Sequence, residues 1–195
     1  MILLNNKELP AINSGMDRRK FIATGLAVIT ATMVPKKILA AVKDSLSEKK
    51  LSFYNVYSHE NLETVYWKDG QFVPDALSMI NHIFRDSRTG KVKAIKTDLL
   101  DVLFDIRRKL KNKEPFHIIS GYRTPHSNAL LRKRKKGVAK NSLHMYGKAV
   151  DISLPGYSTK ALRRTAMSLR RGGVGYYPRS KFVHVDVGQV RYWWG

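Results

Sequence analysis

The sequence of 195 residues contains no cysteine. Disulfide bonds, thiolate zinc sites and a cysteine nucleophile are therefore excluded, although cysteine-free chains occur in every compartment. Acidic residues are also scarce, because 15 Asp and Glu stand against 36 Lys and Arg and give a formal charge of +21. Such an excess predicts an anionic partner: nucleic acid, anionic lipid or an acidic polymer such as the bacterial cell wall. Charge alone does not choose among these, and simple solubility is a further explanation.

Long hydrophobic runs are missing as well. The uncharged apolar stretch at residues 21–34 is shorter than the ~20 residues that a membrane-spanning helix needs. Arg18 and Arg19 come just before it. A basic segment before a short apolar stretch is typical of an export signal, and paired arginines there resemble the twin-arginine signal. We predict that residues 1–41 are such a signal, read by the Tat machinery, with an uncleaved anchor as the alternative. The periplasm or cell envelope is the expected location.

The remainder of the chain is predicted to form a short linker and one domain. Residues 42–50 are polar and charged, as in a linker, and residues 51–195 are numerous enough to bury a core. The first 40 residues hold six basic and two acidic residues, so the rest keeps a formal charge of +17. The basic character therefore belongs to the domain itself.

Hydrophobic periodicity predicts a mixture of strands and helices. A hairpin is expected at 63–73, followed by helices at 74–86, 95–111, 125–136 and 158–171 and strands at 116–120, 148–154, 174–178 and 182–187. Asp98, Asp101 and Asp105 on the second helix are expected to be a solvated face paired with cations. The basic run 132–136 is either a binding patch or a helix end favoured by the dipole.

Two of the predicted strands carry candidate metal ligands. Strict alternation in 148–154 and 182–187 directs the valines, isoleucine and leucine toward the core, and Asp151, His184 and Asp186 toward the opposite face. His144 can return over the first strand through a bend at Gly147. His, Asp and His are the ligands of a catalytic zinc that keeps one coordination position open for water. Spacing alone leaves a metal site and a purely structural role about equally supported.

An arginine is predicted to face the same region. Gly121 follows the strand 116–120, and Pro125 comes two residues after Arg123. Glycine and proline on either side make a stiff turn, which would aim the guanidinium of Arg123 at one fixed point.

Three sequence blocks resemble a known family of peptidases. Residues 142–151, SLHMYGKAVD, carry the S-x-H-x-x-G-x-A-x-D pattern of the LAS-type zinc peptidases of the M15 group. Together with SGYRTP at 120–125 and a third block at 172–186, which begins GGVGYY and ends FVHVD, they are similar to the YcbK/MepK murein endopeptidase family. The similarity spans about residue 51 to the C-terminus. It implies an α+β fold of the LAS/hedgehog type, in which a small antiparallel sheet carries the metal and helices pack on its other face.

The resemblance also implies roles for individual residues. His144, Asp151 and His184 would be the Zn²⁺ ligands, and Arg123 would steady the developing oxyanion.

One departure from the family pattern leaves the general base open. Many relatives place Glu or His two or three residues before the last ligand, where this chain has Phe182 and Lys181. Asp186 is the acidic candidate, either as the base or as the residue that orients a ligand. Tyr176 or Tyr177 is a candidate donor to the substrate, with aromatic core packing as the alternative for at least one of them.

The resulting expectation is an exported zinc metallopeptidase that hydrolyses peptide cross-links of peptidoglycan. The resemblance points to links that involve meso-diaminopimelate, with the 3-3 type among the candidates. A D-Ala-D-Ala carboxypeptidase or dipeptidase on the same scaffold is one alternative, and a non-catalytic wall-binding module is another. Nucleic-acid binding explains the charge but neither the three ligands nor the export signal.

Overall fold

A computed structural model describes residues 47–135 and 137–195. The predicted export signal at 1–41, residues 42–46 of the predicted linker and Lys136 lie outside this part of the chain. In the described ranges, no helix combines the length and the apolar character needed to cross a membrane.

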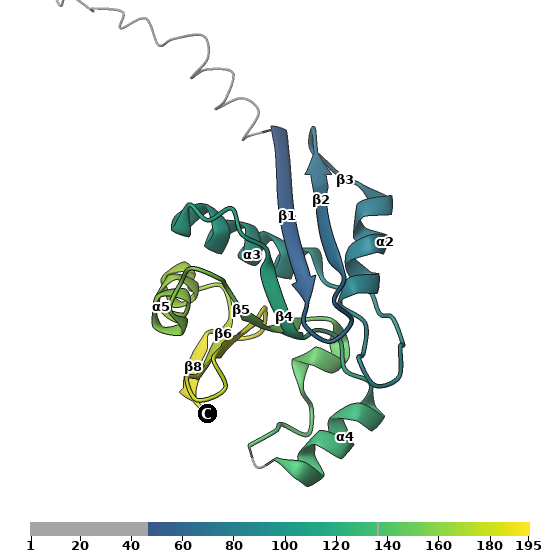
Figure 1. Cartoon of the computed structure of the whole chain (residues 1–195), viewed down its shortest axis with the longest axis vertical. Helices are drawn as coiled ribbons and strands as arrows, with labels where there is room; N and C mark the ends of the chain where they lie inside the picture. The colour runs from purple at the N-terminus through teal and green to yellow at the C-terminus, as the bar shows by residue number, and fades with distance from the viewer. Residues whose placement is uncertain (1–46, 136) are drawn as a thin grey trace, which may run out of the picture. The chain divides into compact units, whose positions relative to one another are not determined.

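An eight-stranded sheet forms the centre of the described structure, with the strand order β3-β2-β1-β4-β5-β7-β6-β8 (Figure 1). The strands are β1 Glu48–Asn55, β2 Asn61–Lys68, β3 Gln71–Phe72, β4 Phe116–Ser120, β5 Ala149–Ser153, β6 Gly173–Tyr177, β7 Phe182–Asp186 and β8 Arg191–Trp194. The helices are α2 Pro74–Ile83, α3 Thr97–Leu110, α4 Pro125–Arg134, α5 Thr159–Leu169 and the 3₁₀ turn η1 Leu143–Tyr146. The predicted helices and the hairpin are confirmed. Each helix is shorter than its predicted range, by one to three residues at one end or at both.

The α+β class is confirmed, but the sheet is large and mixed where a small antiparallel one was expected. β1 pairs with β4 in parallel, and the long connection between them runs through β2, β3, α2 and α3. β8 pairs in parallel with β6 on the side away from β7. β8 was not predicted, and β1 begins at Glu48, so the last three residues of the predicted linker belong to the sheet.

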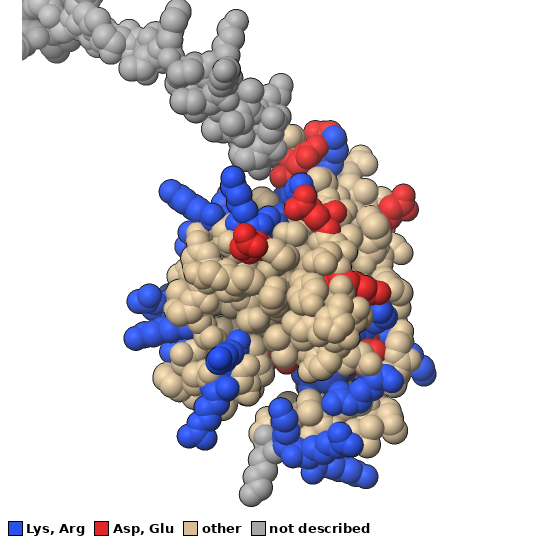
Figure 2. Space-filling view, viewed as in Figure 1, with Lys and Arg blue, Asp and Glu red and all other residues tan. Residues whose placement is uncertain are grey.

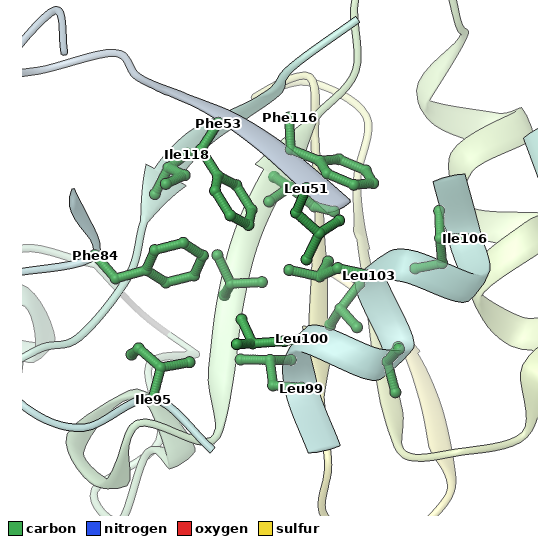
Figure 3. Packing of buried hydrophobic residues seen from close by; sticks show 14 of the residues in the cluster. Leu51, Phe53, Phe84, Ile95, Leu99, Leu100, Leu103, Ile106, Phe116 and Ile118 are labelled. Atoms are coloured by element: carbon green, nitrogen blue, oxygen red, sulfur yellow. The ribbon is translucent and has the colours of Figure 1, made fainter. Parts of the chain in front are cut away.

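One face of the sheet is covered by α2, α3 and α5, which all contact its strands. The apolar stripe of α3 packs there, and Figure 3 shows Leu99, Leu100 and Leu103 converging with side chains from β1 and β4. Val150 and Ile152 of β5 belong to the same buried cluster, which confirms the predicted alternation. Burying each such side chain contributes about 1.5–3 kcal/mol to folding stability. The apolar face of β5 is therefore held firmly in the core, and the opposite face of β5 is free to carry polar groups.

The aspartates of α3 have no contact with the candidate ligands. Asp101 accepts hydrogen bonds from Lys49 at 2.7 Å and from the Tyr66 hydroxyl at 2.8 Å, and Asp105 pairs with Arg171 at 2.8 Å. The expectation that these carboxylates pair with cations is confirmed for both residues.

Candidate metal centre

Asp151 and His184 are side by side because their strands are neighbours. β5 and β7 are antiparallel, and the Cα atoms of Asp151 and His184 are direct partners in the register. Asp186 is two residues further along β7, opposite Ala149. The valines between these residues point into the core, so the three polar side chains share the other face, as the alternation predicts.

His144 reaches this face from η1, the 3₁₀ turn before β5. Gly147 ends the turn with φ +63°, and a Cβ at this position would collide with the carbonyl oxygen of Ala94. Only glycine fits such a close approach at positive φ. The Nδ1–H of His144 donates to the Gly121 carbonyl oxygen at 2.7 Å. Because a carbonyl is only an acceptor, Nδ1 carries the proton and Nε2 presents a lone pair.

The free ring nitrogens and the carboxylate converge on one point. His144 Nε2 lies 3.3 Å from Asp151 Oδ1 and 3.2 Å from His184 Nδ1, which is itself 2.9 Å from Asp151 Oδ1. One ligand atom from each residue lies within 4.8 Å of the others. The second nitrogen of His184, Nε2, is 3.0 Å from Asp186 Oδ2 and donates to it. Two ring nitrogens and a carboxylate oxygen so close together require a shared proton or a cation, and this donor set fits zinc.

The local electrostatics favour the protonation states that a metal needs at His144 and Asp151, but not at His184. Burial lowers the pKa of His144, against the attraction of Asp151. Burial alone would raise the pKa of Asp151, but the two histidines outweigh it and hold that pKa far below its ordinary value. Burial also opposes charge on His184, but hydrogen bonds to Asp151 and Asp186 raise its pKa. A metal held at this point would take the place of the proton on His184 Nδ1.

Asp186 is enclosed by hydrogen-bond donors. Its Oδ1 accepts from the N–H groups of Gly173 and Gly188 and from Arg191 Nη1, and its Oδ2 accepts from His184 Nε2 and Arg191 Nη2. The residue is 1% exposed. Burial alone would raise its pKa, but these donors, His184 first among them, lower it well below the usual range. The carboxylate is thus ionised, fixed and turned toward the ligand His184.

The turn after β4 places Arg123 beside the cluster. The buried carboxylate of Asp86 anchors this turn, since its Oδ2 accepts from the Thr124 backbone N–H at 2.6 Å and from the Thr124 hydroxyl at 2.8 Å. Gly121 packs so closely on the Phe84 carbonyl that a Cβ there would collide with it. The predicted stiff turn is therefore confirmed, with Asp86 as an anchor that the sequence did not reveal.

The side chain of Arg123 is buried and incompletely paired. Its Nη2 lies 3.6 Å from Asp151 Oδ2, and its Nη1 donates to Asn128 Oδ1 at 3.4 Å. Its Nε is buried and has no hydrogen-bond partner among the described residues. Burial lowers the pKa of Arg123, and Asp151 acts in the opposite direction. A donor without an acceptor at a buried site is available to a ligand.

A cavity of about 910 Å³ surrounds the cluster. Arg123 and the three candidate ligands line it, together with aromatic residues that the sequence reasoning missed. The ring of Trp193 in β8 lies 5.2 Å from that of His184, and Arg191 stacks on Trp193 at 5.0 Å while it holds Asp186. One sequence feature could have pointed to Arg191 and Trp193: they are two residues apart, which puts both on one face of a strand.

An α+β domain whose sheet presents two histidines and an aspartate in a cavity, with an arginine beside them, has the features of a metal-dependent hydrolase. Residues 43–193 match the family Peptidase_M15_2, described as peptidoglycan L,D-endopeptidase MepK. The chain belongs to this peptidase family.

Two curated relatives illustrate the similarity. Peptidoglycan L,D-endopeptidase MepK of Escherichia coli K12 is 37% identical over 177 residues, which are 91% of this chain and 97% of the relative. The probable peptidoglycan L,D-endopeptidase MepK of Haemophilus influenzae is 36% identical over 181 residues, which are 92% of this chain and 96% of the relative. The matched region contains the whole candidate metal centre.

Proposed function

We propose that this protein is an exported zinc peptidase that hydrolyses peptide cross-links in peptidoglycan. The observation that carries the proposal is the convergence of His144, Asp151 and His184 in a large cavity beside Arg123. The names of its relatives supply the substrate class, and links that contain meso-diaminopimelate, the 3-3 type among them, are the proposed target.

The zinc would be held by His144 Nε2, Asp151 and His184 Nδ1. When bound, zinc supplies Lewis acidity, which activates water near neutral pH and polarises a carbonyl. The Gly121 carbonyl and the Asp186 carboxylate hold the outer N–H groups of the two histidines and thereby fix the orientation of both rings. Arg123 donates to the carbonyl oxygen as negative charge develops on it, and its burial strengthens that interaction.

Asp186 acts in this proposal as a positioning residue and not as the general base. A base must reach the proton that it removes, whereas both oxygens of Asp186 accept from donors of the protein and its side chain has no exposed surface. Its lowered pKa also makes it a weak acceptor for a proton.

Asp186→Asn is expected to weaken zinc binding about 10- to 100-fold, because it removes the charge that supports His184. The amide would also point N–H groups at the donors that surround Asp186, which costs about 1–3 kcal/mol of folding stability. Metal titration with a competing chelator measures the first effect, and thermal unfolding of the metal-free protein measures the second. Asp105→Asn, in an ion pair on α3 that has no contact with the candidate ligands, is the matched control. Unchanged zinc affinity in Asp186→Asn would contradict the positioning role.

The surface charge is consistent with a polyanionic substrate. Figure 2 shows Lys and Arg gathered over α4, where Arg132, Lys133 and Arg134 form the last turn, while Asp and Glu lie mainly toward the opposite end of this face. Leu131 and Lys135 at the end of α4 line the cavity. Lys135 thus brings the basic run to the cavity, which favours the binding-patch interpretation. Peptidoglycan carries free carboxylates, and a basic surface would hold the protein on it.

Digestion of purified, cross-linked muropeptides tests the proposed function directly. We expect the purified protein to contain about one zinc per chain, as three protein ligands imply, and to convert dimeric muropeptides to monomers. Mass spectrometry of the products identifies the bond that is cut, and a chelator should abolish the reaction. Release of terminal D-alanine alone would indicate a carboxypeptidase, and binding to the wall without cleavage would indicate a binding module.

A further inference from the structure

Tyr177, the last residue of β6, lines the cavity. Gly175 is the register partner of His184, and Tyr177 is two residues further along the strand, so both side-chain positions face the site. The ring of Tyr177 stacks on that of Phe182, with centroids 4.5 Å apart. Tyr176 faces the other side of the sheet, where it contacts Trp194 and Arg163. Only Tyr177 of this pair lines the cavity.

The hydrogen bond to Tyr177 fixes the role that its hydroxyl can play. Trp193 Nε1 donates to the Tyr177 oxygen at 3.0 Å, and an indole nitrogen is only a donor. The hydroxyl proton of Tyr177 must therefore point away from Trp193. Among residues 47–135 and 137–195, no acceptor for that proton is found. The phenol is a donor without a partner, held in place by stacking and by an accepted hydrogen bond.

Trp193 connects this donor to the metal centre. Its ring lies against His184, and Arg191 covers Trp193 while it binds Asp186. The position of the phenol is thus tied to the ligand that Asp186 orients. Such preorganisation is what makes a donor effective in catalysis, because no reorganisation is needed when charge develops.

Arg123 and Tyr177 line the same cavity. Arg123 also has a buried Nε–H for which the described part of the chain offers no acceptor. The Tyr177 hydroxyl on β6 and the Arg123 Nε–H in the turn after β4 are thus two hydrogen-bond donors without acceptors among the described residues, and both residues line one cavity.

We propose that Tyr177 is a further catalytic residue, whose hydroxyl donates a hydrogen bond to the scissile carbonyl oxygen as that oxygen becomes negatively charged. This inference rests on the proposed peptidase function. It adds to Arg123 a neutral donor that acts without changing its own charge. No bond to the substrate forms or breaks at the phenol, and its proton stays on the oxygen.

Tyr177→Phe tests the role because it keeps the stacking on Phe182 and removes only the hydroxyl. Loss of one oxyanion donor lowers kcat by about 10²-fold. A contact that strengthens only in the transition state lowers kcat and kcat/KM equally, so KM for purified cross-linked muropeptides should stay within about twofold. Tyr176→Phe, on the opposite face, is the matched control and should keep kcat within about twofold of the parent. Trp193→Phe removes the N–H that orients the phenol and should lower kcat by about 10-fold.

Zinc content and the unfolding temperature of each variant are measured alongside the kinetics. A Tyr177→Phe protein with full zinc content, the parent unfolding temperature and reduced kcat supports the proposal. Unchanged kcat overturns it, and so does a rise in KM alone, which would indicate a ground-state contact. A loss of kcat that follows loss of zinc also overturns it, because the role would then be structural. If the parent protein itself cuts no muropeptide, the proposed function fails first and this inference fails with it.

Discussion

His144→Ala is expected to lower the hydrolysis of cross-linked muropeptides by about 10³-fold or more and to leave the purified protein without stoichiometric zinc. The physical reason is the geometry of the cluster, in which His144 Nε2 stands 3.3 Å from Asp151 and 3.2 Å from His184. Removal of the ring leaves two ligands, which are too few to hold the ion and to fix its geometry. Product release by liquid chromatography and metal analysis of the same sample are the two measurements.

The matched control for this variant is His126→Ala. His126 is exposed on α4 and does not belong to the cluster, so its removal should change neither zinc content nor rate by more than about twofold. Binding of His144→Ala to isolated cell wall should persist, because the basic surface is intact. Cleavage by a zinc-free His144→Ala protein would refute the metal-dependent mechanism.

Arg123→Gln is expected to lower kcat by about 10²- to 10³-fold while zinc remains bound, since a buried donor is lost that stabilises charge in the transition state. The side chain of Arg123 is nearly enclosed, and its Nη2 lies 3.6 Å from Asp151, so the variant also leaves that carboxylate less compensated. Steady-state kinetics with muropeptides measure the first effect, and a chelator titration measures zinc affinity.

Arg123→Lys separates charge from geometry at this position. Lysine keeps the positive charge but lacks the planar fork of donors, so it should recover only part of the lost rate. Equal rates for Arg123→Gln and the parent would exclude a role for this side chain in catalysis. A loss of rate that is explained fully by loss of zinc would indicate that Arg123 supports the metal centre and not the oxyanion.

The candidate site was largely predictable because its residues obey local rules. Alternation in β5 and β7 places Asp151, His184 and Asp186 on one face, and the turn chemistry around Arg123 predicts a rigid presentation of its guanidinium. The choice between the two roles of Asp186 was not predictable. It depends on the donors that surround the carboxylate, and Arg191, Gly173 and Gly188 come from segments whose positions no local pattern reveals.

The extent of the sheet was the main feature that sequence reasoning did not find. Parallel pairing of β1 with β4 depends on a connection of about 60 residues that holds two strands and two helices, and periodicity does not encode the partner of a strand. β8 has four residues and holds Trp193, whose contact with His184 follows only from the tertiary arrangement. Residues that act through long-range pairing therefore remained hidden, while those with a local signature did not.

The strand order has a consequence for the behaviour of the protein at high concentration. The sheet ends in β3, which has two residues and is followed at once by Pro74, and in β8, which has four residues. Long, flat outer strands expose unpaired backbone groups that recruit strands of other molecules and start aggregation. Both outer strands of this sheet are too short to offer such a template. The long strand β1 lies between β2 and β4, but β3 pairs only with Trp67 and Lys68 of β2. Among the described residues, 61–65 of β2 therefore have no strand partner on the outer side, and self-association through the sheet would have to begin there.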